Sequence, residues 1–373
     1  MQQTILLFAA ASLFLSLTVN YFLLKYLRQL GIYNKQRREN LVRWAAQSKP
    51  SIGGIGFFAV FLLSFLAICG LGGWLDGAVQ TALPATLPAL SLTISATIPC
   101  FLLCCTIGFL VGLLDDSFVM PPRFKFIGQL LCALIMSLGG VVISISDNAV
   151  FNYIFTAVWV IGIMNSINML DNMDGITAGV SAGIILNILL LSSVFLFPYN
   201  FFLVGMFCAL LGFLYYNWSP SKIFMGDAGS QLLGIFLAFT SVLFVWNTPY
   251  ALPHISAKLV LPAIIFMLPV MDTTTVTIHR LLRGQSPAVG GRDHLTHHLA
   301  YCGLNDRQVA GVFATLSAIT VLLTYYVASV MQAKQWTSTY TIVAALFLLI
   351  VFCVFQYFYR IGHQKQAAQS NKK

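Results

Sequence analysis

The fold is decided by the run Thr93–Leu114, TISATIPCFLLCCTIGFLVGLL, which contains no charged side chain. A helix rises about 1.5 Å per residue, so this run is long enough to cross the roughly 30 Å of hydrocarbon in a bilayer. Further apolar runs of similar length lie at 4–24, 53–74, 127–146, 151–170, 176–197, 200–218, 228–247, 259–280, 309–331 and 338–359. We therefore predict an all-α polytopic integral membrane protein with about eleven transmembrane helices, forming a single transmembrane domain over residues 1–373.

The composition supports this class of protein and excludes others. Apolar residues make up 58% of the chain and charged residues 8%, against about 25% charged residues in soluble domains. So little charge cannot coat the surface of a soluble protein. The net charge of +9 would otherwise suggest nucleic-acid binding, but the basic residues fall between apolar runs, where they act as topology signals. No nucleic-acid partner is predicted.

The basic residues also predict the orientation of the chain. If the chain crosses the bilayer at every run, eighteen of its 20 Lys and Arg residues share one face, leaving Lys258 and Lys334 on the other. Cytoplasmic loops are enriched in Lys and Arg. The N-terminus is thus predicted to lie outside and the C-terminus in the cytoplasm. The predicted cytoplasmic loops cover approximately 25–52, 115–126, 171–175, 219–228 and 281–308.

Most acidic residues and a histidine group fall on this same face. They comprise the Asp115-Asp116 pair, the stripe Asn165-x-x-Asn168-x-x-Asp171-x-x-Asp174-Gly175, Asp227 before a helix, and Arg292-Asp-His294-Leu-Thr-His297-His298. Adjacent carboxylates at a helix end oppose the helix dipole and need a counter-ion, either a metal or the following Arg123 and Lys125. Polar groups at membrane depth are costly unless paired, so the stripe indicates a site.

Other residues in these segments suggest a metal–diphosphate site. Asp227 lies at a helix start, where free N–H groups suit phosphate, and Phe224 beside it either stacks on a base or belongs to the core. Carboxylate and amide oxygens favour Mg²⁺, with Mn²⁺ as the alternative, over zinc. Asp272 is predicted to pair with His279 or Arg280 and to brace the histidine loop. The repeat of Gly175, Gly179 and Gly183 predicts close helix packing.

Four of these motifs, in order and on one face, resemble the polyprenyl-phosphate N-acetylhexosamine-1-phosphate transferases. The resemblance runs from about Lys49 to His298 and rests on Asp115-Asp116 with Lys125, the Asn/Asp stripe, Phe224-Met-Gly-Asp227-x-Gly-Ser and the histidine loop. The branch that acts on UDP-N-acetylglucosamine has eleven helices and an outside N-terminus, whereas the phospho-muramoyl-pentapeptide branch has ten helices and three contiguous histidines. This sequence resembles the former branch.

The resemblance implies a role for each matching position. The predicted catalytic residues are Asp115, Asp116, Lys125, Asp171, Asp174 and His294. The predicted substrate-binding residues are Lys49 near the nucleotide, Asn217 and Phe224 at uracil, and Arg292, His297 and His298 in the loop that recognises sugar and phosphate. Asp227 and Asn168 are the predicted metal ligands.

The implied enzyme transfers N-acetylglucosamine-1-phosphate from UDP-N-acetylglucosamine to polyprenyl (undecaprenyl) phosphate and releases UMP, initiating cell-wall glycan synthesis. Direct attack is favoured over an aspartyl-phosphate intermediate. The implied location is the bacterial inner membrane with a cytoplasmic active site, and a homodimer is allowed. The alternatives are a phospho-N-acetylmuramoyl-pentapeptide transferase, a membrane prenyltransferase, which the motif spacing fits poorly, and a secondary transporter. Transporter sites lie near the bilayer midplane, and these acids lie at one surface.

Overall fold

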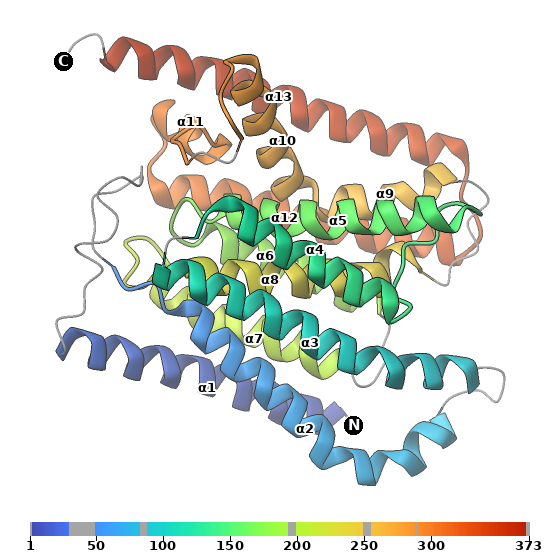
Figure 1. The fold of residues 1–373 in the computed structure, drawn as a ribbon. Coiled ribbons are helices and arrows are strands. Elements are labelled where there is room, and N and C mark those ends of the chain that lie inside the picture. The colour runs from blue at the N-terminus through green and yellow to red at the C-terminus, as the bar shows by residue number, and fades with distance from the viewer. Residues whose placement is uncertain are drawn as a thin grey trace.

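The computed structural model describes residues 2–29, 49–82, 88–118, 120–192, 199–248, 255–287 and 290–370. Within these ranges the chain is helical and contains no β-strand (Figure 1). The one isolated bridge of the described residues joins Ser51 to Phe224. The all-α prediction is confirmed. The helices are α1 (Gln2–Gln29), α2 (Gly53–Ala82), α3 (Pro88–Phe118), α4 (Pro122–Leu138), α5 (Ala149–Leu170), α6 (Ile176–Leu191), α7 (Tyr199–Asn217), α8 (Gly226–Ser241) with the π-turn η1 (Val242–Trp246), α9 (Ile255–Ile265), α10 (Met267–Leu282), α11 (Leu295–Tyr301), α12 (Asp306–Gln332) and α13 (Ser338–Ser370).

Each predicted apolar run overlaps a helix, and the protein is a polytopic membrane protein. In the described part of the chain, eight helices are long and apolar enough to cross a bilayer, or nine if α9 and α10 form one span. The helices α4 and α6 have 17 and 16 residues and are shorter than a full span. For these two helices, membrane crossing stays a prediction.

The continuous helix predicted over 259–280 is wrong. The chain bends by 86° between α9 and α10, around Phe266. Pro269 explains the break, because it has no N–H to donate and its ring conflicts with the carbonyl of Ile265 four residues earlier. The bend turns α10 away from α9 and carries Asp272 and Arg280 toward α11.

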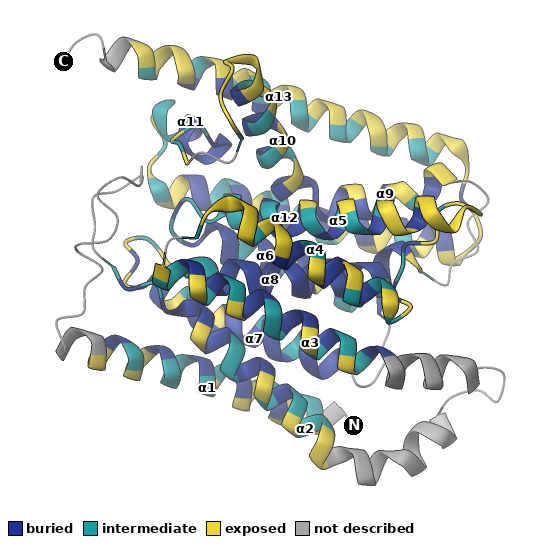
Figure 2. Cartoon of the chain, in the orientation of Figure 1, coloured by how far each residue is buried: buried dark blue, intermediate teal, exposed yellow. Residues whose placement is uncertain are grey.

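The centre of the molecule is α8, which packs against α2, α3 and α5. Nearly every residue of α8 is buried, whereas α13 runs along one side of the molecule with much of its surface exposed (Figure 2). Two glycines let neighbouring backbones reach the start of α8. A Cβ added at Gly112 of α3 would meet Ala228 Cα at 2.5 Å, and one added at Gly54 of α2 would meet Gly229 Cα at 2.8 Å. The start of α8 is therefore held between α2 and α3.

The polar contacts outside the core gather at two ends of the bundle. At one end, Ser144 N donates to Asn247 Oδ1 (3.1 Å) and Lys258 Nζ donates to the Ser144 carbonyl (3.0 Å). This is the end of the bundle where α5 begins. The turn 171–175, which follows α5, lies about 30 Å away, because α5 has 22 residues. We call the end with the 171–175 turn the site end.

Candidate active site

At the site end, Lys125 lies between two carboxylates. Its Nζ forms an ion pair with Asp115 of α3 and a second one, at 3.4 Å, with Asp227 of α8. Asp115 is itself buried, and its Oδ1 accepts a hydrogen bond from Met120 N (2.6 Å), which closes the turn between α3 and α4. The predicted counter-ion of the aspartate pair is thus present in the chain.

Asp116 and Asn168 complete this group. Asp116 Oδ2 accepts a hydrogen bond from the Ala228 N–H (2.9 Å). This amide lies in the first turn of α8, where backbone N–H groups have no acceptor within the helix. From α5, Asn168 Nδ2 donates to Asp227 Oδ1 (2.6 Å) and to Ser230 Oγ (2.8 Å). We call Asp115, Asp116, Lys125, Asn168 and Asp227 the charged cluster. It brings together residues from four helices.

The donor set of the charged cluster fits Mg²⁺. Its three carboxylates outnumber its one ammonium, and the available ligands are hard oxygens. Among the described residues, no three His, Cys, Asp or Glu side chains are arranged to hold a metal ion by themselves. Mg²⁺ usually takes one or two carboxylates and completes its shell with water and phosphate oxygens. Asp227 fits this pattern, and so does Asn168 once its amide is rotated to present Oδ1.

A second polar group surrounds Lys49, just before α2. Lys49 Nζ lies 3.4 Å from Asp174 Oδ2 and donates to Ser221 Oγ (2.9 Å). Asp174 also accepts from the Ser221 N–H (2.9 Å) and hydroxyl (2.7 Å). The ammonium lies 5.2 Å from the centre of the Phe224 ring, within the range of a cation–π contact. Lys49, Asp174 and Phe224 were predicted as site residues from separate segments of the sequence, and Lys49 contacts the other two here.

Backbone contacts hold this second group in shape. Phe224 N donates to the Pro50 carbonyl (2.9 Å), and its own carbonyl accepts from Ile52 and Gly53. The Asn217 side chain accepts from the Gly175 N–H (2.9 Å) and donates to the Ile223 carbonyl (2.8 Å). Asn217 therefore joins the turn after α5 to the segment before α8. Asp171, the C-cap of α5, lies in the same turn.

The histidine loop forms α11, whose N-cap is His294. The prediction that Asp272 pairs with His279 or Arg280 is wrong. Its buried carboxylate contacts His294 Nδ1 (2.8 Å) and accepts from the Leu295 N–H (2.8 Å). His279 lies against Gln356 instead (3.1 Å). Asp272 does brace the loop, but through His294, because the face of α10 that bears it meets the start of α11.

His297 and His298 are buried in the packing of α11. Burial lowers the pKa of His297 to about 3, helped by the nearby His294 and His298. Burial also lowers the pKa of His298 to about 4, with His363 contributing. Neither ring nitrogen of His298 has a hydrogen-bond partner among the described residues. Both side chains are therefore neutral near pH 7, and His298 packs as an aromatic ring.

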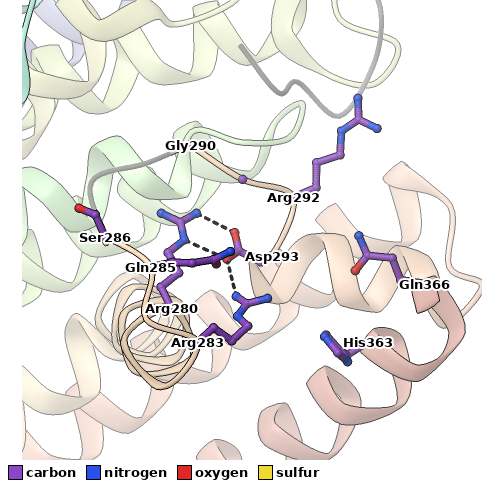
Figure 3. A pocket seen from close by; sticks show the side chains of 10 residues that line it. Arg280, Arg283, Gln285, Ser286, Gly290, Arg292, Asp293, His363 and Gln366 are labelled. Atoms are coloured by element: carbon purple, nitrogen blue, oxygen red, sulfur yellow. Dashed lines mark hydrogen bonds and ion pairs between the residues drawn. The ribbon is translucent and has the colours of Figure 1, made fainter. Parts of the chain in front are cut away.

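Arg292 lines a pocket of about 450 Å³ beside the histidine loop (Figure 3). In this pocket both carboxylate oxygens of Asp293 accept hydrogen bonds from the Arg280 guanidinium (2.9 and 2.6 Å). Asp293 Oδ2 also accepts from Arg283 Nη2 (3.0 Å). Burial raises the pKa of Asp293, but the hydrogen bonds and charge of Arg280 lower it more, so its pKa lies below the usual value. These pairs fix the loop that presents Arg292.

One contact ties α11 to the rest of the site end. Thr296 Oγ1 donates to Asn172 Oδ1 (2.6 Å), in the turn that holds Asp171 and Asp174. Four further polar residues make these contacts and were not among the predicted site residues: Asn172, Ser221, Ser230 and Thr296. Ser, Thr and Asn are common in turns and caps, so their types gave no signal. Asp272, by contrast, was predicted to brace the histidine loop because it is an acid inside an apolar run.

These features define a multi-pass helical membrane protein with a carboxylate-rich site at one end of its bundle. Residues 98–245 match the model of glycosyl transferase family 4. The chain is 30% identical to a probable undecaprenyl-phosphate N-acetylglucosaminyl 1-phosphate transferase of Bacillus subtilis, over 65% of this chain and 67% of that protein. It is 29% identical to the decaprenyl-phosphate N-acetylglucosaminephosphotransferase of Mycolicibacterium smegmatis (53% and 55%), and 28% identical to a phospho-N-acetylmuramoyl-pentapeptide-transferase of Thermoanaerobacter (87% and 99%). The chain belongs to glycosyl transferase family 4.

Proposed function

We propose that this protein transfers N-acetylglucosamine-1-phosphate from UDP-N-acetylglucosamine to polyprenyl phosphate and releases UMP. The observation that carries the proposal is the charged cluster, in which Lys125 pairs with Asp115 and Asp227 at the start of α8. Such a site suits a reaction between two phosphate groups. The names of the Bacillus and Mycolicibacterium relatives supply the sugar and the lipid class.

In this reaction an oxygen of the lipid phosphate attacks the β-phosphorus of the UDP-sugar. The bond between that phosphorus and the bridging oxygen breaks, and UMP leaves with the electron pair. A phosphate monoester is largely ionised near neutral pH, so Asp115 or Asp116 has mainly to orient it or to accept its last proton. Lys125 neutralises charge as the two anions approach, and positioning with charge stabilisation is what phosphoryl transfer requires of a protein.

The charged cluster supplies the proposed metal site, and the polar group around Lys49 supplies the proposed nucleotide site. Mg²⁺, held by the carboxylate of Asp227 and the side-chain oxygen of Asn168, would neutralise the charge of the diphosphate. The Phe224 ring stacks on uracil, and Lys49 supplies positive charge beside it. Arg292 and His294 face the sugar and its phosphate. Asp171 and Asp174 hold the turn between these regions.

The location follows from the same chemistry. The UDP-sugar is water-soluble and made in the cytoplasm, so the site end faces the cytoplasm and the protein lies in the bacterial inner membrane. The polyprenyl tail stays in the bilayer. Phe124 and Phe126, which flank Lys125 on α4, are 45% and 50% exposed and offer the tail an apolar surface next to the charged cluster.

The test is an assay on purified protein with Mg²⁺, undecaprenyl phosphate and either UDP-N-acetylglucosamine or UDP-N-acetylmuramoyl-pentapeptide. UMP release and the mass of the lipid product are measured for each donor. The proposal expects turnover with the first donor only. The long match to the Thermoanaerobacter relative favours the second donor, whereas the spacing His294-Leu-Thr-His297 opposes it. Turnover with the second donor alone would replace the proposed substrate, and turnover with neither would reject the function.

A further inference from the structure

Three amide side chains, two of them buried and one partly buried, meet directly beneath the charged cluster. Gln129 of α4 donates through Nε2 to Asn165 Oδ1 (3.3 Å) and to Gln231 Oε1 (3.2 Å). In return, Asn165 Nδ2 donates to Gln129 Oε1 (2.8 Å). Gln129 and Gln231 are 1% and 0% exposed. We call Gln129, Asn165 and Gln231 the amide triad.

Each member of the amide triad lies one helical turn from a residue of the charged cluster. Gln129 follows Lys125 by four residues on α4, and Gln231 follows Asp227 by four on α8. Asn165 precedes Asn168 by three on α5. Residues three or four apart share a helix face. The same three helices are therefore joined twice, once at the charged cluster and once a turn deeper in the bundle.

The contribution of the amide triad to stability does not explain its presence. Amides are costly to bury at membrane depth, and apolar side chains of similar volume would pack there at less cost. Moreover, Gln231 Nε2 finds no acceptor among the described residues, although it is buried. What hydrogen bonds add is direction, because they fix the rotation and depth of one helix against another, whereas apolar contacts tolerate sliding.

We propose that Gln129, Asn165 and Gln231 are positioning residues, which hold α4, α5 and α8 at the rotation where Lys125, Asn168 and Asp227 converge. This role requires no contact with the substrate. The inference rests on the proposed function, since the geometry that they set is that of the proposed phosphoryl-transfer site. A misplacement of about 1 Å in such a site costs on the order of 100-fold in rate.

The first measurement is the kinetics of UMP release by Gln129→Leu and Gln231→Leu. The expected result is a kcat lower by roughly 10- to 100-fold with little change in KM for the UDP-sugar, because binding groups stay while the reacting groups shift. The matched control is Asn187→Leu. Asn187 is an equally buried amide, bonded to Thr320 Oγ1 (3.2 Å) between α6 and α12, and its loss should leave kcat unchanged.

The second measurement needs no activity. Cys104 of α3 and Cys132 of α4 lie side by side, each sulfur contacting the other residue's carbonyl oxygen (3.4 and 3.6 Å). In a chain that keeps only these two cysteines, the rate of disulfide formation under a membrane-permeant oxidant reports the rotation of α4. Gln129→Leu should change this rate, and Asn187→Leu should not.

The two measurements separate the possible failures. A wild-type protein that releases no UMP with either donor would reject the proposed function, and the cross-linking rate would still decide whether the amide triad sets the rotation of α4. Normal kcat and an unchanged cross-linking rate in Gln129→Leu would overturn the inference, with the proposed function left standing. Equal kcat losses in Gln129→Leu and Asn187→Leu would also overturn it, because they would show general destabilisation.

Discussion

At the scale of single residues, the charged cluster depends most on Asp227. Its carboxylate contacts both Lys125 (3.4 Å) and Asn168 (2.6 Å), and it lies in the first turn of α8. Free N–H groups at this helix end favour negative charge, whether that of Asp227 or of an incoming diphosphate. Neutralising Asp227 would thus remove a charge without changing the shape of the site.

We expect Asp227→Asn to lower kcat by roughly 100-fold or more, because charge complementarity is the main contribution of such a site. The amide oxygen can still accept from Asn168, so the protein should stay folded, as thermal unfolding in detergent would show. Asp147→Asn is the matched control, since Asp147 is exposed in the connection before α5. Full activity with an unchanged Mg²⁺ requirement in Asp227→Asn would remove Asp227 from the proposed metal site.

The buried His298 predicts a loss of stability in acid. Its pKa is lowered to about 4 in the folded protein, while an unfolded chain has a His pKa near 6.5. Below about pH 6.5 the unfolded chain therefore binds a proton that folded His298 does not, and the free energy of unfolding falls until about pH 4. His298→Phe removes this contribution, so its Tm should fall less than the wild-type Tm between pH 7.5 and 5. An identical fall in both proteins would contradict the prediction.

The sequence indicated the residues with distinctive chemistry but not their partners. Asp115, Lys125 and Asp227 stood out because charge is rare in this chain, and they do converge. The pairing of Asp272 with His294 could not be predicted, because it depends on the angle at which α10 leaves the bend at Phe266. Ser221 was missed for a different reason. A serine in a turn has many local uses, and only the fold shows that it bridges Lys49 and Asp174.

At the scale of helices, the position of Asp227 depends on Gly112. A Cβ at this residue of α3 would fall on the Asp227 carbonyl and within 2.5 Å of Ala228 Cα. Backbone atoms cannot move aside alone, so α8 must shift away from α3. We expect Gly112→Ala to lower both kcat and Tm, since overpacking typically costs about 1–3 kcal/mol. Gly162→Ala in α5, where nothing lies within 4 Å, is the control and should keep both.

Apart from the break between α9 and α10 and the short α11, the helices were well predicted, because each apolar run is long and bounded by polar residues. The spacing of glycines was less informative. Of the repeat Gly175, Gly179 and Gly183, Gly183 makes the tightest approach to a neighbouring helix, with Ser317 Cβ 2.9 Å from its added Cβ. Gly175 is instead required by its φ of +78° at the start of α6. The closest backbone approaches are at Gly54 and Gly112, which no regular spacing marks.

At the scale of the whole molecule, the site exists only because separate segments end at the same end of the bundle. Contacts there join Lys49 to Asp174, Asn172 to Thr296, and Arg307 to the Ser219 carbonyl (2.9 Å). The sequence anticipated this gathering through its basic residues, which predicted one face for all these segments. The basic loop residues 30–48, which contribute much of that signal, lie outside the described residues.

The side of the membrane that each end faces can be measured with single cysteines in a Cys-free, active background. Lys222 and Gln285 are exposed at the site end, whereas Asp147 and Gln335 are exposed in the connections that precede α5 and α13. Because Lys and Arg concentrate at the site end, cysteines at 222 and 285 should react with a membrane-impermeant maleimide only after permeabilisation. Cysteines at 147 and 335 should react in intact cells. The proposed function requires the same result, since a UDP-sugar donor from the cytoplasm would have to reach Lys49, Lys125 and Asp227 without crossing the bilayer. Labelling of 222 from outside would place the site end on the other side of the membrane and reject the proposed cytoplasmic active site, even if the helical fold were correct.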